Sequence, residues 1–396
     1  MPDMTERSDP NPLAPLPSRF SPLARAAVLG AGAWGTALAS ALQRGGVPTC
    51  LWARRADVAE SIHAHRRNPQ HLPGIELPSG LGASTDMAQA VQGAQLVILA
   101  VPSVVMRAIA RQLAPLIAPD TVVLTASKGI EQGSGALMTQ VLDEELGSAV
   151  LTGSIGGPSF AVEVASGKST LLTLALPALE RFHPRHKIAR RLADSLVQQL
   201  AGAGVTLEQT RDAVGAQVGG ALKNMIAIAC GMATAQGMGE NARAGIITRG
   251  LDDMSRLTQA MGGRIETLLG CSGVGDLFLT AASEHSRNTR LGLRLGGAGA
   301  QAVGHADELA EGAVSVISVE ILERKYGLQL NVAAAVRDVL QQRLPVERAL
   351  QRLLHESAPG MRPPLARPPK PAVARPPIGH GGESRPAVQP WSLSYA

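Results

Sequence analysis

The chain has 396 residues, of which 45% are hydrophobic, 17% are charged and 2% are aromatic. This length and apolar content are enough for two folded domains with buried cores. The formal net charge is +5, but five basic residues against one acidic residue after position 356 account for most of it. The rest is nearly neutral and offers few rings on which bases could stack, so we expect no nucleic-acid partner.

Neither a secretory signal nor a membrane span is predicted. The first 24 residues are polar and broken by prolines, without the apolar core of a signal peptide. The longest uninterrupted apolar run, around residues 96–101, has the length of a strand and falls well short of the roughly 20 residues that span a bilayer. We therefore expect a cytoplasmic location and no membrane insertion.

Residue types that bind metals are sparse and scattered. Cys50, Cys230 and Cys271 lie far apart and form no CxxC pair, which favours buried reduced thiols over disulfides or a metal centre. Histidines at positions 63, 65 and 71 are close in sequence, but no acidic or thiol partner stands at a ligand spacing. We expect no metal.

The first structural motif is a glycine-rich turn. A short apolar run at residues 26–29 predicts a buried strand, and it passes directly into Gly30-x-Gly32-x-x-Gly35 and a string of helix formers. Gly30 would permit a tight turn, Gly32 would let backbone N–H groups approach a pyrophosphate, and Gly35 would let the helix pack on the sheet. The pattern favours a dinucleotide site over an ordinary glycine-rich turn.

The second predicted strand, at residues 48–52, bears on the choice of cofactor. An NAD-specific site of this type carries an acidic residue near its end, which hydrogen-bonds the ribose 2′-hydroxyl. Here the chain offers Arg54 and Arg55, whose N–H donors suit a 2′-phosphate, so we expect NADP to be preferred and NAD to be the alternative. The other interpretation is that both arginines are solvated residues that open a helix.

Further buried strands are predicted at residues 95–101, 121–125 and 149–152. The turns at the carboxyl ends of parallel strands line the ligand crevice of a doubly wound sheet. Lys128, in the turn after the strand 121–125, is therefore a candidate anion contact, although a lone loop lysine is commonly just solvated. The last of these strands leads into a stiff loop at residues 156–161, Gly-Gly-Pro-Ser-Phe-Ala.

After about residue 204 the strand–helix alternation stops and long helical patterns follow. The decisive helix covers residues 218–229, where Lys223 and Asn224 interrupt an apolar face. Gly219 and Gly220 lie one turn before them, and two glycines in a helix suggest that something must come close. A desolvated lysine has a lowered pKa suited to proton transfer, but it could also extend to solvent, and the residues alone leave both alternatives open.

Composition and pattern then divide the chain into four parts. We predict a flexible extension at residues 1–24, an α/β domain of the NAD(P)-binding Rossmann type at 25–208, an all-helical domain at 209–356, and a disordered Pro/Arg-rich tail at 357–396. In the helical part, Asp276 follows a Gly-rich turn, and Ser286-Arg287-Asn288 resembles a phosphate-binding donor set. Taken singly, each of these residues is explained as a helix cap or a surface residue.

Several motifs in order resemble the bacterial-type glycerol-3-phosphate dehydrogenase family that uses NAD(P)+. The matching stretches lie at residues 30–39, 101–103, 127–131, 157–168, 218–229, 240–251, 273–280 and 286–292, within residues 25–355. The resemblance implies a Rossmann-type domain joined to an all-α domain, with the active site between them. It also implies reversible reduction of dihydroxyacetone phosphate to sn-glycerol 3-phosphate, which feeds glycerophospholipid synthesis, and a homodimer is possible.

The resemblance also implies roles for individual residues. Lys223 matches the family's proton-transferring lysine, with Asp276 and Asn224 beside it. The implied cofactor contacts are Gly30, Gly32, Ala33, Trp34, Gly35, Arg54, Arg55, His71, Lys128, Ala161, Arg287, Leu309 and Glu311. The implied substrate contacts are Lys128, Gly157, Ser159, Lys223, Asp276, Ser286, Arg287 and Asn288.

Three positions depart from the family pattern. Ala33 stands where serine is usual, which matters little if the contact is through the backbone N–H. His71 replaces a tyrosine and Ser169 replaces a proline, which puts one cofactor contact and one loop in question. Two rival functions remain open: a dehydrogenase for carboxylated hydroxyacids, which needs no phosphate clamp, and a non-catalytic NADP sensor, which needs no proton donor.

Overall fold

The computed structural model describes residues 22–283, 286–298 and 311–355, which all belong to one compact unit. Eight strands form a single sheet in the order β3-β2-β1-β4-β5-β6-β7-β8, in which only the β6–β7 pair is antiparallel. The strands are β1 (Ala26–Leu29), β2 (Thr49–Trp52), β3 (Gly82–Ser84), β4 (Leu96–Leu99), β5 (Val122–Thr125), β6 (Leu151–Gly156), β7 (Thr170–Ala175) and β8 (Val205–Thr210). The order from β3 to β6 is that of a doubly wound dinucleotide-binding sheet.

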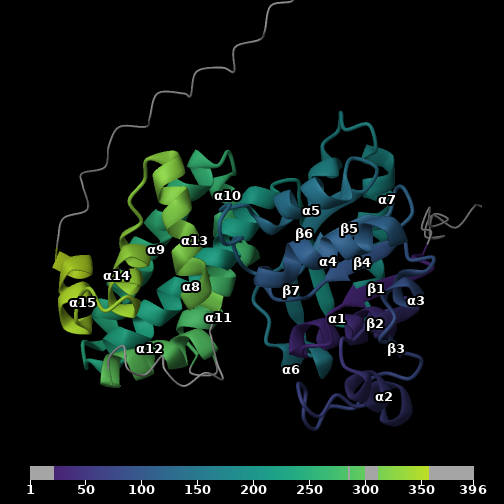
Figure 1. Ribbon diagram of the computed structural model, residues 1–396, viewed down its shortest axis with the longest axis horizontal. Coiled ribbons are helices and arrows are strands. Elements are labelled where there is room, and N and C mark those ends of the chain that lie inside the picture. The colour runs from purple at the N-terminus through teal and green to yellow at the C-terminus, as the bar shows by residue number, and fades with distance from the viewer. Residues whose placement is uncertain (1–21, 284–285, 299–310, 356–396) are drawn as a thin grey trace, which may run out of the picture. The chain divides into compact units, whose positions relative to one another are not determined.

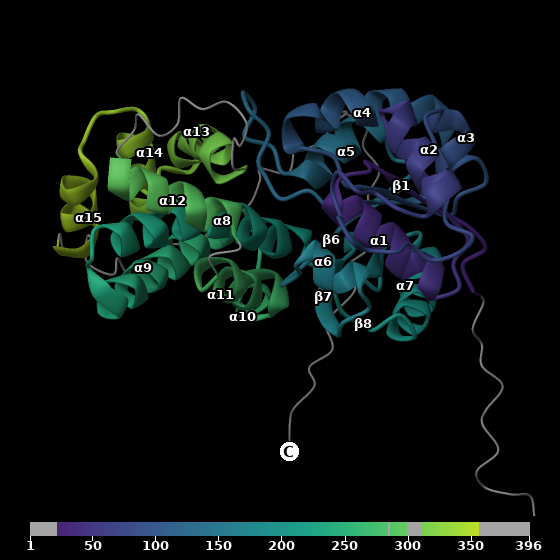
Figure 2. The ribbon, with the colours of Figure 1, turned by 90° about the horizontal axis from the view of Figure 1, so that it is seen from below.

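Helices cover both faces of this sheet (Figures 1 and 2). Helices α3, α4 and α5 share one hydrophobic core with the strands, and α1, α2, α6 and α7 share a second core on the other face. Their bounds are α1 (Ala33–Arg44), α2 (Ala56–His65), α3 (Met87–Val91), α4 (Met106–Leu113), α5 (Met138–Leu146), α6 (Ala161–Ala165) and α7 (His186–Ala201). The two cores account for the nearly continuous burial of the central strands.

A separate hydrophobic core holds the helices that follow β8. They are α8 (Ala213–Ala235), α9 (Gly239–Ala260), α10 (Ile265–Leu269), α11 (Asp276–Ala281), α12 (Arg287–Ala298), α13 (Glu311–Tyr326), α14 (Asn331–Leu340) and α15 (Val346–His355). The α/β and all-helical parts predicted from the sequence are thus confirmed as fold classes. The boundary at 208/209 stays a prediction, and β8 continues two residues past it.

The predicted strands are present, and three strands, β3, β7 and β8, were not predicted. β3 has only three residues, Gly-Ala-Ser, which carry little β propensity, and β8 lies at the sheet edge beside the predicted boundary. Ordered structure also begins inside the expected extension, because the side chain of Leu23 is buried and its N–H donates to Gln199 Oε1 at 3.0 Å. The predicted tail at 357–396 lies outside the described residues.

The glycine turn after β1 has physical reasons for two of its glycines. Gly30 has a φ of +114°, and a Cβ there would lie 2.6 Å from the carbonyl oxygen of Ala100. A Cβ on Gly35 would lie 1.9 Å from the carbonyl oxygen of Gly30. A larger side chain is therefore excluded at both positions, and the turn brings the start of α1 against the ends of β1 and β4.

Helix α8 is the central helix of the helical part (Figure 2). It is long and apolar enough to cross a membrane, because Lys223 and Asn224 interrupt its apolar run without making the segment polar. The sequence predicted no membrane span. The relevant 18-residue window is 89% buried inside the protein. Such burial is typical of the core helix of a folded domain.

The two adjacent glycines of α8 face different neighbours. A Cβ on Gly219 would lie 2.6 Å from the carbonyl oxygen of Ser272, in a single π-helical turn, η4 (Cys271–Gly275). The chain at 272–276 is therefore helical, where the sequence predicted a Gly-rich turn. A Cβ on Gly220 would meet only the side chain of Lys128, at 3.5 Å. The expectation that something approaches this part of the helix closely is confirmed.

These contacts predict opposite effects of the same substitution. Gly219→Ala should lower the free energy of unfolding by roughly 1–3 kcal/mol, because backbone must move to admit the methyl group. Gly220→Ala should leave it unchanged or raise it by up to about 1 kcal/mol, because alanine favours a helix and its methyl group would make only an ordinary van der Waals contact with Lys128. Urea unfolding of both variants provides the measurement. Equal effects of the two changes would contradict the packing described here.

Candidate functional site

The candidate site lies at the carboxyl edge of the parallel strands. In the sheet, β1 lies between β2 and β4. The connection after β1 therefore leads to one side and the connection to β4 leads to the other, which leaves a crevice beyond the carboxyl ends of β1 and β4. Because β1, β4, β5 and β6 run parallel, the turns that follow them all reach this edge. Helix α8 contacts β6 and β7 and so adds residues of the helical part to the same edge.

The turn after β1 provides a place for phosphate groups. Gly32 precedes α1, and this helix has no side-chain cap and no acidic residue in its first turn. Its first N–H groups therefore face the crevice with the positive end of the helix dipole. A Cβ on Gly32 would meet nothing within 4 Å, and Ala33 and Trp34 are partly exposed beside it. This cradle fits the pyrophosphate of a dinucleotide.

Asn68 holds that cradle in place. Its buried amide donates to the carbonyl oxygen of Ala31 at 2.9 Å and to Thr36 Oγ1 at 2.9 Å, which ties the loop after α2 to the glycine turn. Asn68 Oδ1 and Trp34 Nε1 are both buried without a partner among the described residues. Buried polar atoms are almost always paired, so these two point to a ligand or ordered water at this place.

The two arginines after β2 differ in their partners. Arg55 Nε donates to Asp57 Oδ1 at 2.9 Å, and the two side chains form a salt bridge. Arg54 is exposed and has no hydrogen-bond or ionic partner within the described part of the chain. Only Arg54 is therefore free to meet a ligand without first breaking an ion pair.

A buried charge cluster joins the sheet to the helical part. Asp276, at the start of α11, is 1% exposed and lies between two lysines. Its Oδ1 accepts from Lys223 Nζ at 2.5 Å and its Oδ2 accepts from Lys128 Nζ at 2.7 Å. Lys128 Nζ also donates to the carbonyl oxygen of Gly157 at 3.2 Å. Each oxygen of one carboxylate thus holds one ammonium group.

Thr280 completes the cluster. Its hydroxyl accepts from Lys223 Nζ at 2.8 Å and donates to the backbone oxygen of Asp276 at 2.7 Å. Burial lowers the pKa of Lys223 from 10.5 to about 8, with the positive charge of Lys128 adding to the effect and Asp276 opposing it. Such a pKa places Lys223 near neutrality, where a proton donor or acceptor works best.

A second polar network lies beside the cluster. Asn288 Nδ2 donates to Asn224 Oδ1 at 2.9 Å, and Asn288 Oδ1 accepts from the backbone N–H of Gly312 at 3.1 Å. Asn224 Nδ2 and Ser272 Oγ are buried and have no partner among the described residues. Asn224 follows Lys223 on α8 and Ser272 lies four residues before Asp276, so each orphaned group points to a ligand or ordered water near the cluster.

A cavity adjoins Lys128 and Asp276. It is bounded by the residues at the ends of β5 and β6 and by residues of α8 and η4, among them Gly157, Gly220 and Ser272. Its wall carries the charged side chains of Lys128 and Asp276 beside apolar residues and glycine backbone, and Lys223 does not line it. The two charged groups give it fixed points for a polar or charged ligand.

The structure gives positions for most of the other residues implied by the family resemblance. Ser159 is partly buried in the loop after β6, and Ala161 begins α6. Ser286 is buried and Arg287 is exposed at the start of α12, next to Asn288. His71 is exposed in the loop after α2. Glu311 begins α13, and Leu309 lies outside the described residues.

Three residues of the site received no individual role from the sequence, although Ser272 and Thr280 belong to the polar stretch around Asp276. Thr280 lies four residues after Asp276, and this spacing on a helix is the signal that would have placed it on the same face. Ser272 and Asn68 carried no such signal, because their positions depend on tertiary packing. Among residues 22–283, 286–298 and 311–355, no group of three His, Cys, Asp or Glu side chains could hold a metal ion.

The sheet order, the uncapped glycine turn and the buried lysine together define a Rossmann-type dinucleotide-binding dehydrogenase. Residues 25–181 match the family model of the NAD-dependent glycerol-3-phosphate dehydrogenase N-terminus, and residues 212–351 match the model of its C-terminus. The chain belongs to the NAD-dependent glycerol-3-phosphate dehydrogenase family.

Curated relatives and a solved structure agree with this assignment. The chain is 41% identical over 330 residues to glycerol-3-phosphate dehydrogenase [NAD(P)+] of Rhodospirillum rubrum, which covers 83% of this chain and 91% of that protein. It is 42% identical to the enzyme of the same name from Stenotrophomonas maltophilia, with 83% and 94% covered. The crystal structure of glycerol-3-phosphate dehydrogenase from Coxiella burnetii matches with a TM-score of 0.76 and 33% identity, covering 84% of this chain and 99% of that one.

The fold alone is shared more widely. A D-mandelate dehydrogenase structure matches 83% of this chain with a TM-score of 0.52 at 13% identity. The architecture therefore accommodates enzymes named for different substrates, and the substrate of this chain has to be argued from its site.

Proposed function

We propose that this chain catalyses the reversible NAD(P)H-dependent reduction of dihydroxyacetone phosphate to sn-glycerol 3-phosphate, which supplies glycerophospholipid synthesis. The observation that carries the proposal is the buried Lys223–Asp276–Lys128 cluster, which lies at the carboxyl edge of a dinucleotide-binding sheet. Family membership supports the reaction, and the geometry assigns a task to each member of the cluster.

Lys223 is the proton donor in this proposal. The bound nicotinamide cofactor supplies the hydride. The substrate oxygen becomes an alkoxide as the carbonyl is reduced, and the Lys223 ammonium gives it a proton. Asp276 holds Lys223 in position and balances its charge, and Thr280 fixes the direction of a second N–H bond. In the reverse reaction the neutral amine takes the proton of the glycerol phosphate hydroxyl.

The remaining cations and donors bind the phosphate and orient the reacting end. Lys128 is 18% exposed and has one N–H direction left after its bonds to Asp276 and Gly157. Arg287 is exposed beside Asn288 and offers a guanidinium fork, the geometry best suited to a phosphate. Ser159, Ser286 and the orphaned amide of Asn224 add neutral donors. The phosphate is remote from the reacting carbon, so the free energy gained by binding it can hold the carbonyl in the orientation that the reaction needs.

We propose further that NADPH is preferred over NADH. The support is Arg54, which is exposed, unpaired among the described residues, and placed just after β2, where the ribose of a bound dinucleotide lies. No acidic residue occupies positions 53–55 to bind a 2′-hydroxyl. Arg55 plays no part in this preference because Asp57 already binds it.

The test of the reaction is loss of NADPH absorbance when dihydroxyacetone phosphate is added to the purified protein. Lys223→Met keeps the length of the side chain and removes the ammonium group, so turnover should fall by roughly 10²–10⁴-fold, the usual contribution of general acid catalysis. NADPH affinity, measured by fluorescence titration, should be unchanged. Oxidation with hydroxyacid precursors but not with the phosphorylated ketone would overturn the proposal in favour of a carboxylated substrate.

The pKa of Lys223 predicts opposite pH dependences for the two directions. Reduction needs the ammonium form, so its rate should fall as the pH rises through about 8, and oxidation of glycerol 3-phosphate should rise over the same range. Thr280→Val removes a hydrogen bond that stabilises the ammonium form, so the pKa of Lys223 should fall and the pH–rate profiles of both directions should shift to lower pH by roughly one unit. Thr280→Ser keeps the hydroxyl and should leave both profiles where they are. Identical pH profiles for Val and Ser would exclude this role of the hydroxyl.

The cofactor preference is tested by a matched pair of arginines. Arg54→Ala should raise the KM for NADPH by about tenfold or more, the effect of losing one charge-assisted contact to phosphate, and leave the KM for NADH nearly unchanged. Arg55→Ala should alter neither value, since Arg55 is bound to Asp57. The measurement is steady-state kinetics with each cofactor. Equal loss with both cofactors in the Arg54 variant would rule out a 2′-phosphate contact.

A further inference from the structure

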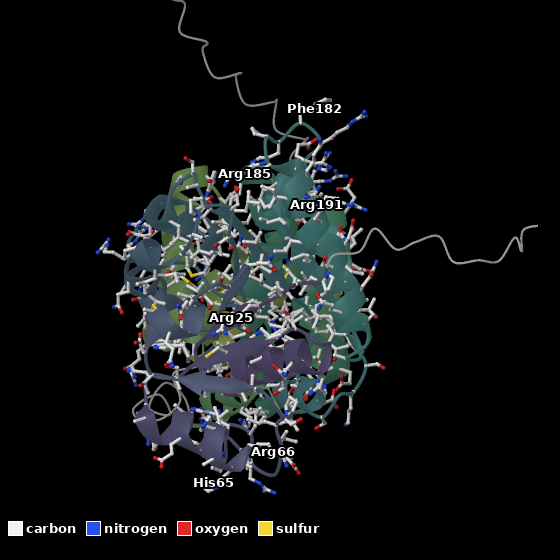
Figure 3. The ribbon with its side chains drawn as sticks, turned by 90° about the vertical axis from the view of Figure 1, so that its right-hand side faces the viewer. Arg25, His65, Arg66, Phe182, Arg185 and Arg191 are labelled. Carbon is white, nitrogen blue, oxygen red and sulfur yellow. The ribbon has the colours of Figure 1, made fainter. Side chains whose placement is uncertain are left out.

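One exposed loop combines an apolar tip with unpaired cations. The segment 180–191 lies between β7 and the first turns of α7, and its sequence is Glu-Arg-Phe-His-Pro-Arg-His-Lys-Ile-Ala-Arg-Arg. The side chain of Phe182 is 86% exposed, the highest value among the large exposed hydrophobic residues of the described chain. Figure 3 shows Phe182 at the tip of this loop, on the same end of the molecule as Arg185 and Arg191.

The cations around Phe182 fall into two groups. Arg185, Arg190 and Arg211 are engaged: Arg185 with Asp120 and backbone oxygens, Arg190 with Asp194, and Arg211 with Glu180. Three others, Arg181, Lys187 and Arg191, have no acidic partner within the described ranges. The Arg181 guanidinium lies 5.9 Å from the centre of the Phe182 ring. Lys187 and Arg191 are four residues apart on α7 and therefore share one helix face.

The loop is fixed by the fold, so it presents Phe182 in a defined position. Arg185 donates to the carbonyl oxygens of Ser148, Ala149 and Val150, just before β6. Backbone bonds from His183 to Glu180 and from His186 to His183 add local turns. Presenting an aromatic ring in a prearranged place lowers the entropy lost when it binds.

The loop lies beyond the amino end of β6, whereas the catalytic cluster lies beyond the carboxyl ends of β5 and β6. β7 runs antiparallel to β6, so the chain leaving β7 reaches the amino end of β6, next to residues 148–150. Lys128 and Gly157 follow the carboxyl ends of β5 and β6. A partner bound to the loop would therefore leave the candidate active site open.

We propose that the segment 180–191 docks this protein on an anionic lipid surface, with Phe182 inserted at the level of the headgroups and Arg181, Lys187 and Arg191 above the lipid phosphates. A single projecting aromatic ring surrounded by cations can insert between lipid headgroups while the cations bind the lipid phosphates. It is neither a pocket for a partner side chain nor a platform with several rings for stacked bases. The contact is reversible, departs from the sequence-based expectation of no membrane insertion in this one ring without any membrane-spanning segment, and goes beyond the proposed reaction.

The first experiment measures co-flotation of the full-length protein with vesicles. Vesicles of phosphatidylcholine and phosphatidylglycerol in equal parts should bind the protein, vesicles of phosphatidylcholine alone should not, and added salt should release it, because the charge contacts are screened. Lys187→Glu with Arg191→Glu should weaken binding at least tenfold. Arg324→Glu with Arg348→Glu changes the net charge equally on exposed residues elsewhere and should bind like the unaltered protein.

The second experiment tests insertion of the ring. Phe182→Ser should weaken binding to the mixed vesicles by roughly tenfold, and Phe278→Ser, which changes another exposed phenylalanine, should not. All three native cysteines are buried, so Phe182→Cys can be labelled selectively with an environment-sensitive fluorophore. Its emission should shift to the blue on mixed vesicles, whereas a label at Phe278→Cys should not respond.

Several outcomes would overturn the proposal. They are absence of binding to mixed vesicles, equal binding to neutral vesicles, or unchanged binding of the Phe182 and Lys187/Arg191 variants. If only the Lys187→Glu/Arg191→Glu variant loses vesicle binding, and the fluorophore on Phe182→Cys does not respond to vesicles, then the contact is purely ionic and any polyanion could make it. NADPH oxidation in solution should be the same for the Phe182→Ser and unaltered proteins, so failure here is distinguishable from failure of the proposed reaction.

Discussion

The site depends on one carboxylate that is buried between two ammonium groups. Asp276 is 1% exposed, and an isolated charge at that depth would be strongly disfavoured. Lys223 and Lys128 compensate it, and because Lys128 belongs to the sheet part and Asp276 and Lys223 to the helical part, the ion pairs also join the two. Two cations around one anion leave a net positive site, which suits a phosphorylated substrate.

The same packing explains why Lys223 can exchange protons. The helix α8 has glycine where the Ser272–Gly273 backbone crosses it, so η4 lies against the helix and encloses the lysine. This enclosure removes water and lowers the pKa, and the nearby carboxylate prevents the shift from going so far that the ammonium form disappears. Burial and the Asp276 carboxylate thus act on the pKa of Lys223 in opposite directions, and their balance sets the pH range in which Lys223 exchanges protons.

Much of this arrangement could be predicted from the sequence, because it depends on local patterns. The glycine turn, the alternation of strands and helices, and the two glycines before Lys223 are local signals with direct physical meaning. The edge strand β8, the ordering of Leu23, and the places of Asn68 and Ser272 depend on contacts between residues far apart in the chain, which no local pattern records. The contact between Lys128 and Asp276, 148 residues apart, is of the same kind.

The fold alone does not identify the substrate of this chain. A doubly wound sheet with a helical partner occurs in dehydrogenases named for quite different substrates, as the D-mandelate enzyme shows. In this chain the donors at the site are the two lysines of the cluster and the Asn224 amide, whose Nδ2 has no partner among the described residues. An anionic ligand compensates the excess positive charge of the site, whereas a neutral ligand would leave it uncompensated. The charge balance of the site thus favours an anionic substrate, and membership of the glycerol-3-phosphate dehydrogenase family identifies that anion as a phosphate.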